Sequence, residues 1–185
     1  NTLTFDGGRI LADNTDGFGF VRALSQAAGP EACARPAVVL GAGGAARGIV
    51  AALLDAGAPR IGLANRTAGR ATALADLYDD RVAPVPWDRP LADLDGPTLL
   101  VNTTSLGMTG QPSLDIDLAP LPSGSVVADI VYTPLDTPLL RAARARGLLA
   151  VDGLGMLLHQ AVPGFKRWFG IRPEVDEALR QAVLA

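Results

Sequence analysis

The sequence predicts an α/β fold, with a doubly wound parallel sheet of the Rossmann type between a leading hairpin and trailing helices. Short apolar runs alternate with helical stretches along most of the chain. A glycine turn joins one of these runs directly to a helix. Of the 185 residues, 49% are apolar, which is enough for one well-buried core.

The first elements in order are a hairpin and a helix. Residues 2–5 and 9–12 are strand-like and flank Asp6-Gly7-Gly8, which has the composition of a tight loop. Asn14-Thr15-Asp16-Gly17 then predicts a helix start, and Gly29-Pro30 ends that helix after about Ala28.

From Ala37 the pattern is that of a parallel sheet. We expect strands at 37–40, 60–64, 82–85, 98–101, 125–130 and 148–151, with helices at 45–56, 68–77 and 137–146. The connection from Trp87 to Asp95 is rich in Pro and Asp, so its crossover helix is short or missing. Two helices follow, at 154–168 and 173–184, the second with Pro173 in its first turn. We divide the chain into residues 1–28, 29–152 and 153–185.

Composition excludes several classes of protein. A net charge of −3 without a basic run argues against nucleic acid as the main partner. Cys33 is the only cysteine, which excludes a disulfide framework or a thiolate metal cluster and fits a cytoplasmic protein. We see no export leader and no apolar span long enough for a membrane. The start without Met, inside a strand-like pattern, suggests a portion of a longer protein.

The glycine turn Gly41-Ala42-Gly43-Gly44-Ala45 has the composition of a dinucleotide cradle. Gly41 permits the tight turn, Gly43 removes a Cβ from the path of a pyrophosphate, and small Ala46 permits close helix packing. The N–H groups at the helix start then face the phosphates. Similar turns also occur where nothing binds, so this motif alone is weak.

Asn65-Arg66-Thr67 follows the next strand, where an NAD-binding fold usually offers a carboxylate to the ribose. With Thr67 as N-cap, Arg66 lies just outside the helix and Arg70 at its third position, so both can reach one helix start. Two guanidiniums favour the 2′-phosphate of NADP over the hydroxyl of NAD. The alternative is two solvated arginines, and the glycine turn one unit earlier favours the binding interpretation.

Two polar clusters follow later strands, at the sheet edge where such folds bind ligands. In Asn102-Thr103-Thr104-Ser105, the hydroxyls could line the cofactor or could form caps and turns, and we give both equal weight. In Asp129-Ile130-Val131-Tyr132, the phenol of Tyr132 is more commonly a packed aromatic than a ligand-binding group.

The third cluster is a glycine turn with polar residues behind it. Gly153 and Gly155 permit close approach to a flat ring, and Gln160 lies two helical turns further on, with donors and an acceptor that suit a polyhydroxylated substrate. His159, the only histidine, points about a quarter-turn away from Gln160 and is interpreted as structural. Asp16 lies in a first helical turn, where capping is the simpler interpretation.

Taken together, these stretches resemble the shikimate dehydrogenase family along the whole chain. The Asn-Thr-Asp-Gly and Gly-Leu-Gly-Met-Leu motifs are specific, whereas the glycine turn is generic. The stretches that carry the resemblance are Asn1-Thr2, 13–19, 41–46, 65–67, 102–105, 129–132 and 153–157.

The resemblance implies reversible, NADP-dependent hydride transfer between 3-dehydroshikimate and shikimate in aromatic amino-acid biosynthesis. It implies that Asn1 and Asp16 bind substrate hydroxyls, Asp16 paired with a catalytic lysine, and that Tyr132 and Gln160 complete the substrate site. This role replaces the capping interpretation of Asp16. The expected cofactor contacts are Gly41, Ala42, Gly43, Gly44, Ala45, Asn65, Arg66, Thr67, Arg70, Thr104, Ile130 and Gly153.

The chain departs from the family in one respect. The family's catalytic lysine and Ser-x-Ser motif lie in an N-terminal domain, and the only lysine here, Lys166, does not match. We therefore expect the cofactor-binding part of such an enzyme, able to bind NADP but with little turnover alone. Without that domain, Leu3, Phe5 and Ile10 are uncovered and predict self-association.

Two alternative functions stay open. An NAD-dependent quinate/shikimate dehydrogenase shares the scaffold, and Arg66 and Arg70 speak against it. A non-catalytic NADP-binding module would also lack the lysine. The oligomeric state is not decided by the sequence, and a homodimer is kept among the options.

Overall fold

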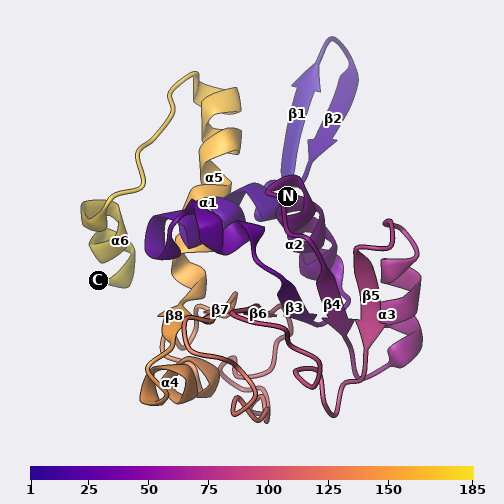
Figure 1. Ribbon diagram of the computed structural model, residues 1–185. Helices are drawn as coiled ribbons and strands as arrows, with labels where there is room; N and C mark the ends of the chain where they lie inside the picture. Colours follow the sequence, from indigo (N-terminus) through magenta and orange to yellow (C-terminus); the bar gives the residue numbers. More distant parts are fainter.

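The centre of the computed structural model, which describes all 185 residues, is a six-stranded parallel sheet with the order β5-β4-β3-β6-β7-β8 (Figure 1). The strand order reverses between β3 and β6, and ligands of such sheets bind beside that reversal. The strands are β3 (Ala37–Leu40), β4 (Ile61–Ala64), β5 (Val82–Val85), β6 (Leu99–Asn102), β7 (Val126–Asp129) and β8 (Leu149–Val151). The predicted doubly wound sheet is confirmed, with every strand within one residue of its expected ends.

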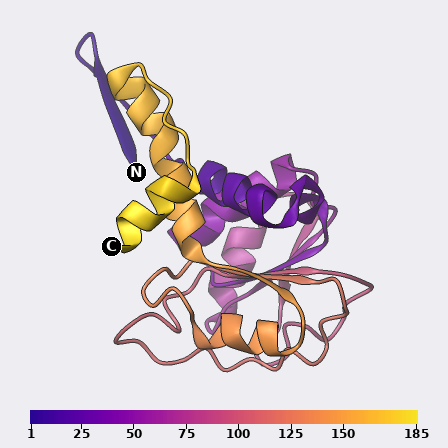
Figure 2. The same ribbon diagram turned by 90° about the vertical axis from the view of Figure 1, so that its left-hand side faces the viewer.

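The two faces of the sheet are covered differently. Val39 and its neighbours on one face pack against α1 (Asp16–Ala28), α2 (Gly44–Asp55) and α3 (Ala68–Ala75). Val38 and Leu40 point to the opposite face, where they pack against α4 (Pro138–Ala145) and loop residues. Figure 2 shows α4 on the side of the sheet opposite α1 and α2.

Loops cover much of the α4 face. The connections from Pro86 to Thr98 and from Thr103 to Ser125 contain no helix, as predicted for the first of them. Their leucines supply the missing apolar cover, because Leu91, Leu114, Leu118 and Leu121 are all buried in the core of that face. A short 3₁₀ turn, η1 (Pro30–Ala34), leads into β3.

The hairpin of β1 (Thr2–Asp6) and β2 (Arg9–Asp13) projects beyond the sheet beside the long helix α5 (Gly153–Phe169) (Figure 2). The indole N–H of Trp168 donates to the carbonyl of Leu3 at 2.9 Å. Phe5 and Ile10 pair across the hairpin and are 73% and 66% exposed. The hairpin is therefore held by the end of α5 and leaves apolar side chains uncovered.

The last helix, α6 (Glu177–Leu184), begins later than predicted. The expected start at Pro173 is wrong because Asp176 is the N-cap, its carboxylate accepting from the N–H of Leu179 at 2.8 Å. No residue of α6 is buried, and the ion pair between Arg180 and Asp152 at 2.6 Å joins it to the start of α5. None of the helices is both long and apolar enough to cross a membrane.

Candidate functional site

A cavity of about 430 Å³ opens at the reversal of strand order. Its walls come from the turn after β3, the start of α3, the loop after β6 and the segment after β5. No acidic side chain lines it. The lining residues are Gly41, Ala42, Gly43, Asn65, Arg66, Arg70, Trp87, Thr103, Thr104, Ser105, Leu106, Gln111 and Pro112. The cavity thus brings together most of the predicted cofactor contacts.

The glycine turn has the shape of a phosphate cradle. Gly41 has φ of +105°, in the region that favours glycine, and a Cβ there would lie 2.6 Å from Thr103 Oγ1. At Gly43 and Gly44 an added Cβ would meet nothing within 4 Å, so this part of the turn faces open space. Gly43 is the N-cap of α2 without a side-chain cap, which leaves N–H groups of the first turn for an anion. These features fit a dinucleotide pyrophosphate.

The arginine pair lies as expected. Thr67 is the N-cap of α3, which makes Arg70 the third helical residue, and Asn65 Nδ2 donates to the Thr67 carbonyl at 2.9 Å to hold the preceding turn. Arg66 and Arg70 are exposed, line the same cavity and belong to none of the ion pairs of the structure. Two unpaired guanidiniums beside a helix start fit a bound phosphate group.

Two hydroxyls of the loop after β6, those of Thr103 and Thr104, are used within the protein. Thr103 Oγ1 donates to the Leu40 carbonyl at 2.7 Å. Thr104 Oγ1 donates to Asn102 Oδ1 at 2.7 Å and accepts from the Leu106 N–H at 3.1 Å. These contacts are the caps and turns that were one of the two interpretations of this loop. Thr104 lines the cavity, but its hydroxyl is already bonded to Asn102 and Leu106.

Asp129 is a buried carboxylate beside the site, with contacts that were not predicted from the sequence. It is 2% exposed and accepts from Asn102 Nδ2 at 2.9 Å, from the Val131 N–H at 3.0 Å and from Thr137 Oγ1 at 2.7 Å. Burial raises the pKa of its carboxyl, and the three hydrogen bonds oppose that rise. Asp129 therefore fixes the loops after β6 and β7 to each other. The pairing of Asn102 with Asp129 in the parallel register is the signal that could have revealed this contact.

The glycines at the start of α5 permit close packing within the protein. A Cβ on Gly153 would lie 2.2 Å from the Ile130 carbonyl oxygen, and one on Gly155 would lie 3.0 Å from Ala23 Cβ. These contacts explain why both positions are glycine, and the approach of a flat ring at this turn stays a prediction. Gly153 and Ile130 do meet, but neither lines the 430 Å³ cavity.

Three of the four predicted substrate residues come together. Asn1 Nδ2 donates to Asp16 Oδ1 at 2.5 Å and to Gln160 Oε1 at 3.5 Å. Thr15 adds a bond from its hydroxyl to the Gln160 carbonyl at 2.8 Å. The carboxylate of Asp16 thus bonds to Asn1 and caps no helix N–H, contrary to the capping interpretation. Asn1, which precedes β1, thus meets one residue of α1 and one of α5 in this polar cluster.

Tyr132 and Lys166 lie outside the cluster. Tyr132 is 50% exposed on the loop after β7 and hydrogen bonds to none of the three clustered residues. Lys166 is an exposed residue of α5 without an acidic partner in the structure. The chain's only lysine therefore does not pair with Asp16.

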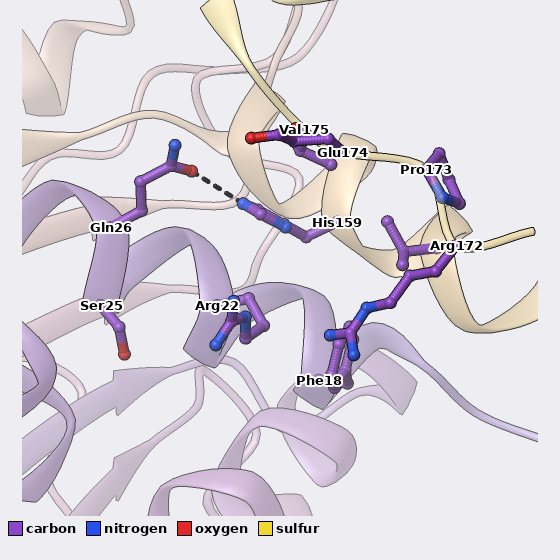
Figure 3. A pocket seen from close by; sticks show the side chains of 10 residues that line it. Phe18, Arg22, Ser25, Gln26, His159, Arg172, Pro173, Glu174 and Val175 are labelled. Carbon is purple, nitrogen blue, oxygen red and sulfur yellow. Dashed lines mark hydrogen bonds between the residues drawn. The ribbon is translucent and has the colours of Figure 1, made fainter. Parts of the chain in front are cut away.

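His159 faces a different cavity, of about 840 Å³, between α1, α5 and the segment that leads to α6 (Figure 3). Its Nε2 lies 2.8 Å from Gln26 Oε1, and the residue is only 9% exposed. Burial, and then the charge of Arg22, lower the pKa of the imidazole. Neighbouring His159 and Gln160 thus serve different sides of α5, and this larger cavity contains none of the predicted site residues.

Comparison with known proteins decides the family. Residues 23–95 match the family described as Shikimate / quinate 5-dehydrogenase, and residues 153–184 match the Shikimate 5'-dehydrogenase C-terminal domain. The shikimate dehydrogenase (NADP(+)) of Dinoroseobacter shibae is 57% identical over 189 residues, covering all of this chain and 67% of that protein. The chain belongs to the shikimate dehydrogenase family. It spans about 65% of the length of the first curated relative that it matches, that of Rhodopseudomonas palustris.

Solved members of the shikimate dehydrogenase family and its neighbours share the fold. The shikimate 5-dehydrogenase of Thermus thermophilus, solved with NADP(H) and shikimate, has a TM-score of 0.76 and 35% identity, covering 93% of this chain and 62% of that chain. The quinate dehydrogenase of Corynebacterium glutamicum, solved with NAD, has a TM-score of 0.84 and 33% identity, covering 98% of this chain and 66% of that chain. Because both nucleotides occur on this scaffold, the fold alone does not choose between them.

Proposed function

We propose that this chain forms the NADP-binding part of a shikimate dehydrogenase, which interconverts 3-dehydroshikimate and shikimate. The observation that carries the proposal is one cavity that joins an open glycine turn to two unpaired arginines and contains no carboxylate. A carboxylate there would repel a 2′-phosphate and favour the ribose hydroxyl of NAD. Arg66 and Arg70 instead offer charge-assisted donors to that phosphate, which favours NADP over the NAD-dependent alternative.

The cofactor roles follow from these positions. The turn from Gly41 to Ala45 binds the pyrophosphate, and Asn65, Arg66, Thr67 and Arg70 surround the phosphorylated ribose. Ile130 and Gly153 lie on the nicotinamide side, and Thr104 supports the cavity wall. When bound, the nicotinamide supplies or accepts the hydride. The protein's contribution is to hold the pyrophosphate and the phosphorylated ribose at the carboxyl ends of β3 and β4, and the nicotinamide beyond β7 and β8.

The polar cluster of Asn1, Asp16 and Gln160 is the proposed substrate side. The two amides have both donors and acceptors, so they can orient ring hydroxyls of shikimate. The Asp16 carboxylate is an acceptor for a hydroxyl proton, and the family resemblance pairs it with a lysine for general acid–base catalysis. Tyr132 completes the substrate side in this proposal.

We further propose that the catalytic lysine lies outside these 185 residues. Two facts support it: the relatives are longer, and Lys166 has no contact with Asp16. In this proposal the remaining N-terminal domain of the enzyme covers the substrate cluster. Residues 1–28 and 153–185 form the substrate side, and residues 29–152 bind NADP. A cytoplasmic location and a homodimer are parts of the proposal that need separate measurement.

Calorimetric titration of this chain with NADP⁺ and with NAD⁺ at one ionic strength tests the proposed cofactor. We expect NADP⁺ to bind about tenfold tighter or more, since charge-assisted contacts to a phosphate are stronger than bonds to a hydroxyl. The Arg66→Ala/Arg70→Ala variant should bind both nucleotides equally. An Arg22→Ala variant is the matched control, because Arg22 is also exposed and unpaired but lies at the other cavity.

Equal binding of the two nucleotides by the unsubstituted chain would contradict the NADP assignment. A preference that survives loss of both arginines would contradict the role of the pair. Turnover of shikimate by these 185 residues at the rate of a complete enzyme would contradict the proposal that the lysine lies elsewhere.

A further inference from the structure

Trp87 stands beside the arginine pair in the sheet register. In the parallel pairing of β4 with β5, Ala64 is opposite Val85. Arg66 lies two residues beyond Ala64, and Trp87 lies two residues beyond Val85. Because parallel strands end at the same edge of a sheet, the indole and the guanidinium emerge next to each other. The cavity lining agrees, since both residues belong to the 430 Å³ cavity.

Trp87 is the only aromatic side chain of that cavity. The other walls are the glycine turn, the two arginines, hydroxyl groups and a few small or aliphatic side chains. These side chains do not offer the flat apolar surface on which the purine base of a dinucleotide stacks. The indole is the one surface of that kind in the cavity.

The indole is also held in place from behind. Trp87 is half-buried and packs against the apolar cluster of the α4 face, which includes Leu40 and Leu91. It lines a second hollow of about 440 Å³ together with Leu91 and Leu114, so it separates that hollow from the dinucleotide cavity. A side chain fixed by packing loses little freedom when a ligand stacks on it.

We propose that Trp87 binds the adenine of the dinucleotide, and this inference rests on the proposed NADP site. The adenine and the 2′-phosphate are attached to the same ribose. A 2′-phosphate bound by Arg66 and Arg70 therefore places the adenine within reach of Trp87, which lies beside Arg66 at the sheet edge. The connection after β5, which contains Trp87, thus contributes to the affinity for the cofactor.

Tryptophan fluorescence tests this contact directly, because the chain has only two tryptophans. In a Trp168→Phe variant all indole emission comes from Trp87, and titration with adenosine 2′,5′-bisphosphate should change it in step with calorimetric binding. In a Trp87→Phe variant the remaining Trp168, which bonds to the hairpin, should not respond. Binding that leaves the Trp87 emission unchanged would overturn the inference.

Affinity gives the second measurement. Trp87→Ala should raise the Kd of both NADP⁺ and adenosine 2′,5′-bisphosphate by about tenfold, and Trp87→Phe by less than about threefold, as expected for loss or retention of base stacking. Leu91→Ala is the matched control, because Leu91 shares the packing of Trp87 but does not line the dinucleotide cavity. It should lower the melting temperature and leave the Kd unchanged.

A Leu91→Ala variant that weakens binding as much as Trp87→Ala would overturn the inference in favour of a packing role. The same holds if Trp87→Ala keeps the original Kd. Failure of the unsubstituted chain to bind NADP⁺ or the bisphosphate would overturn the proposed function and this inference with it. Binding with no effect at Trp87 would overturn the inference alone.

Discussion

Two glycines of this chain have opposite surroundings, although the sequence presents both in glycine turns between a strand and a helix. At Gly153 an added Cβ would lie 2.2 Å from the Ile130 carbonyl oxygen, whereas at Gly43 it would meet no atom within 4 Å. The first glycine is required by the protein's own backbone. The second is required, in the proposed function, by a ligand.

Alanine substitution at the two positions should therefore separate stability from binding. Gly153→Ala forces backbone atoms apart, and overpacking costs about 1–3 kcal/mol, so the melting temperature should fall by roughly 3–10 °C. Gly43→Ala should leave the melting temperature within about 1 °C of the original, because Gly43 has an extended backbone and free space. It should weaken NADP⁺ binding by at least about tenfold. Scanning calorimetry and isothermal titration measure the two effects.

A Gly43→Ala chain that binds NADP⁺ normally would contradict the pyrophosphate role of this turn. A Gly153→Ala chain of unchanged stability would contradict the close contact with Ile130.

Residue roles were predictable where they depend on local geometry. The positions of Gly41, Arg66 and Arg70 follow from a strand end, a cap and helical spacing, and the structure has them there. The bonds from Asn102 to Asp129 and from Thr103 to the Leu40 carbonyl were not predictable in this way, because they depend on which strands are neighbours. Sheet order is a property of the packed molecule, and the sequence pattern alone does not contain it.

At the scale of elements, α1 and α5 pack closely against each other. A Cβ on Gly19 would lie 2.7 Å from the Met156 carbonyl oxygen, and one on Gly155 would lie 3.0 Å from Ala23 Cβ. Small residues on both helices thus permit a close approach, and His159 adds a polar link to Gln26. The two helices hold two members of the polar cluster, because Asp16 begins one and Gln160 lies in the other.

The His159 link should make stability sensitive to acid. Its pKa is lowered in the folded chain, so the unfolded chain takes up a proton first as the pH falls through about 6.5. The contribution of His159 to stability is thus fully present above that pH and decreases below it, until the folded imidazole is protonated as well. The melting temperature is measured at about pH 7.5 and at about pH 5.5. Its decrease between the two should be larger for the unsubstituted chain than for the His159→Gln variant.

Equal decreases in the two chains would contradict this assignment. A His159→Gln chain is a suitable reference because its side chain can still donate to Gln26 and has no proton to gain in this range.

The ends of helices and strands were predictable except where two sequence features indicated different helix starts. All strands and most helices lie within one or two residues of expectation, since apolar alternation and glycine stops are local features. The start of α6 was wrong, because Pro173 gave a strong helix-start signal and the cap at Asp176 a weaker one. Between β5 and β7 the chain has no helix. The Pro-rich loops there bury leucines against the sheet without helical structure.

At the scale of the whole molecule, the hairpin is the part with least support from the rest of the chain. Phe5 and Ile10 are cross-strand partners, so they share one face, and Leu3 is 50% exposed on the same face. Neighbouring exposed apolar side chains of this kind associate in water. The 185-residue chain should therefore self-associate as its concentration rises.

Sedimentation velocity over a range of concentrations measures this association. Phe5→Ser/Ile10→Ser should shift the chain towards a monomer, because it removes the centre of the apolar face. Leu149→Ser is the control, since Leu149 is similarly exposed, at 45%, but lies on the edge strand β8. A monodisperse monomer at high concentration of the unsubstituted chain would contradict the prediction.

Helix α5 reaches from the loop after β7 to the hairpin and contacts both. It begins against the Ile130 carbonyl and ends against the hairpin at Leu3, and its 17 residues span about 25 Å. Gln160 lies near its middle, where the helix packs so closely on α1 that a Cβ on Gly19 would lie 2.8 Å from Gln160 Cβ. The position of Gln160 is therefore set by three separate contacts of one helix, with Ile130 at its start, Gly19 at its middle and Leu3 at its end.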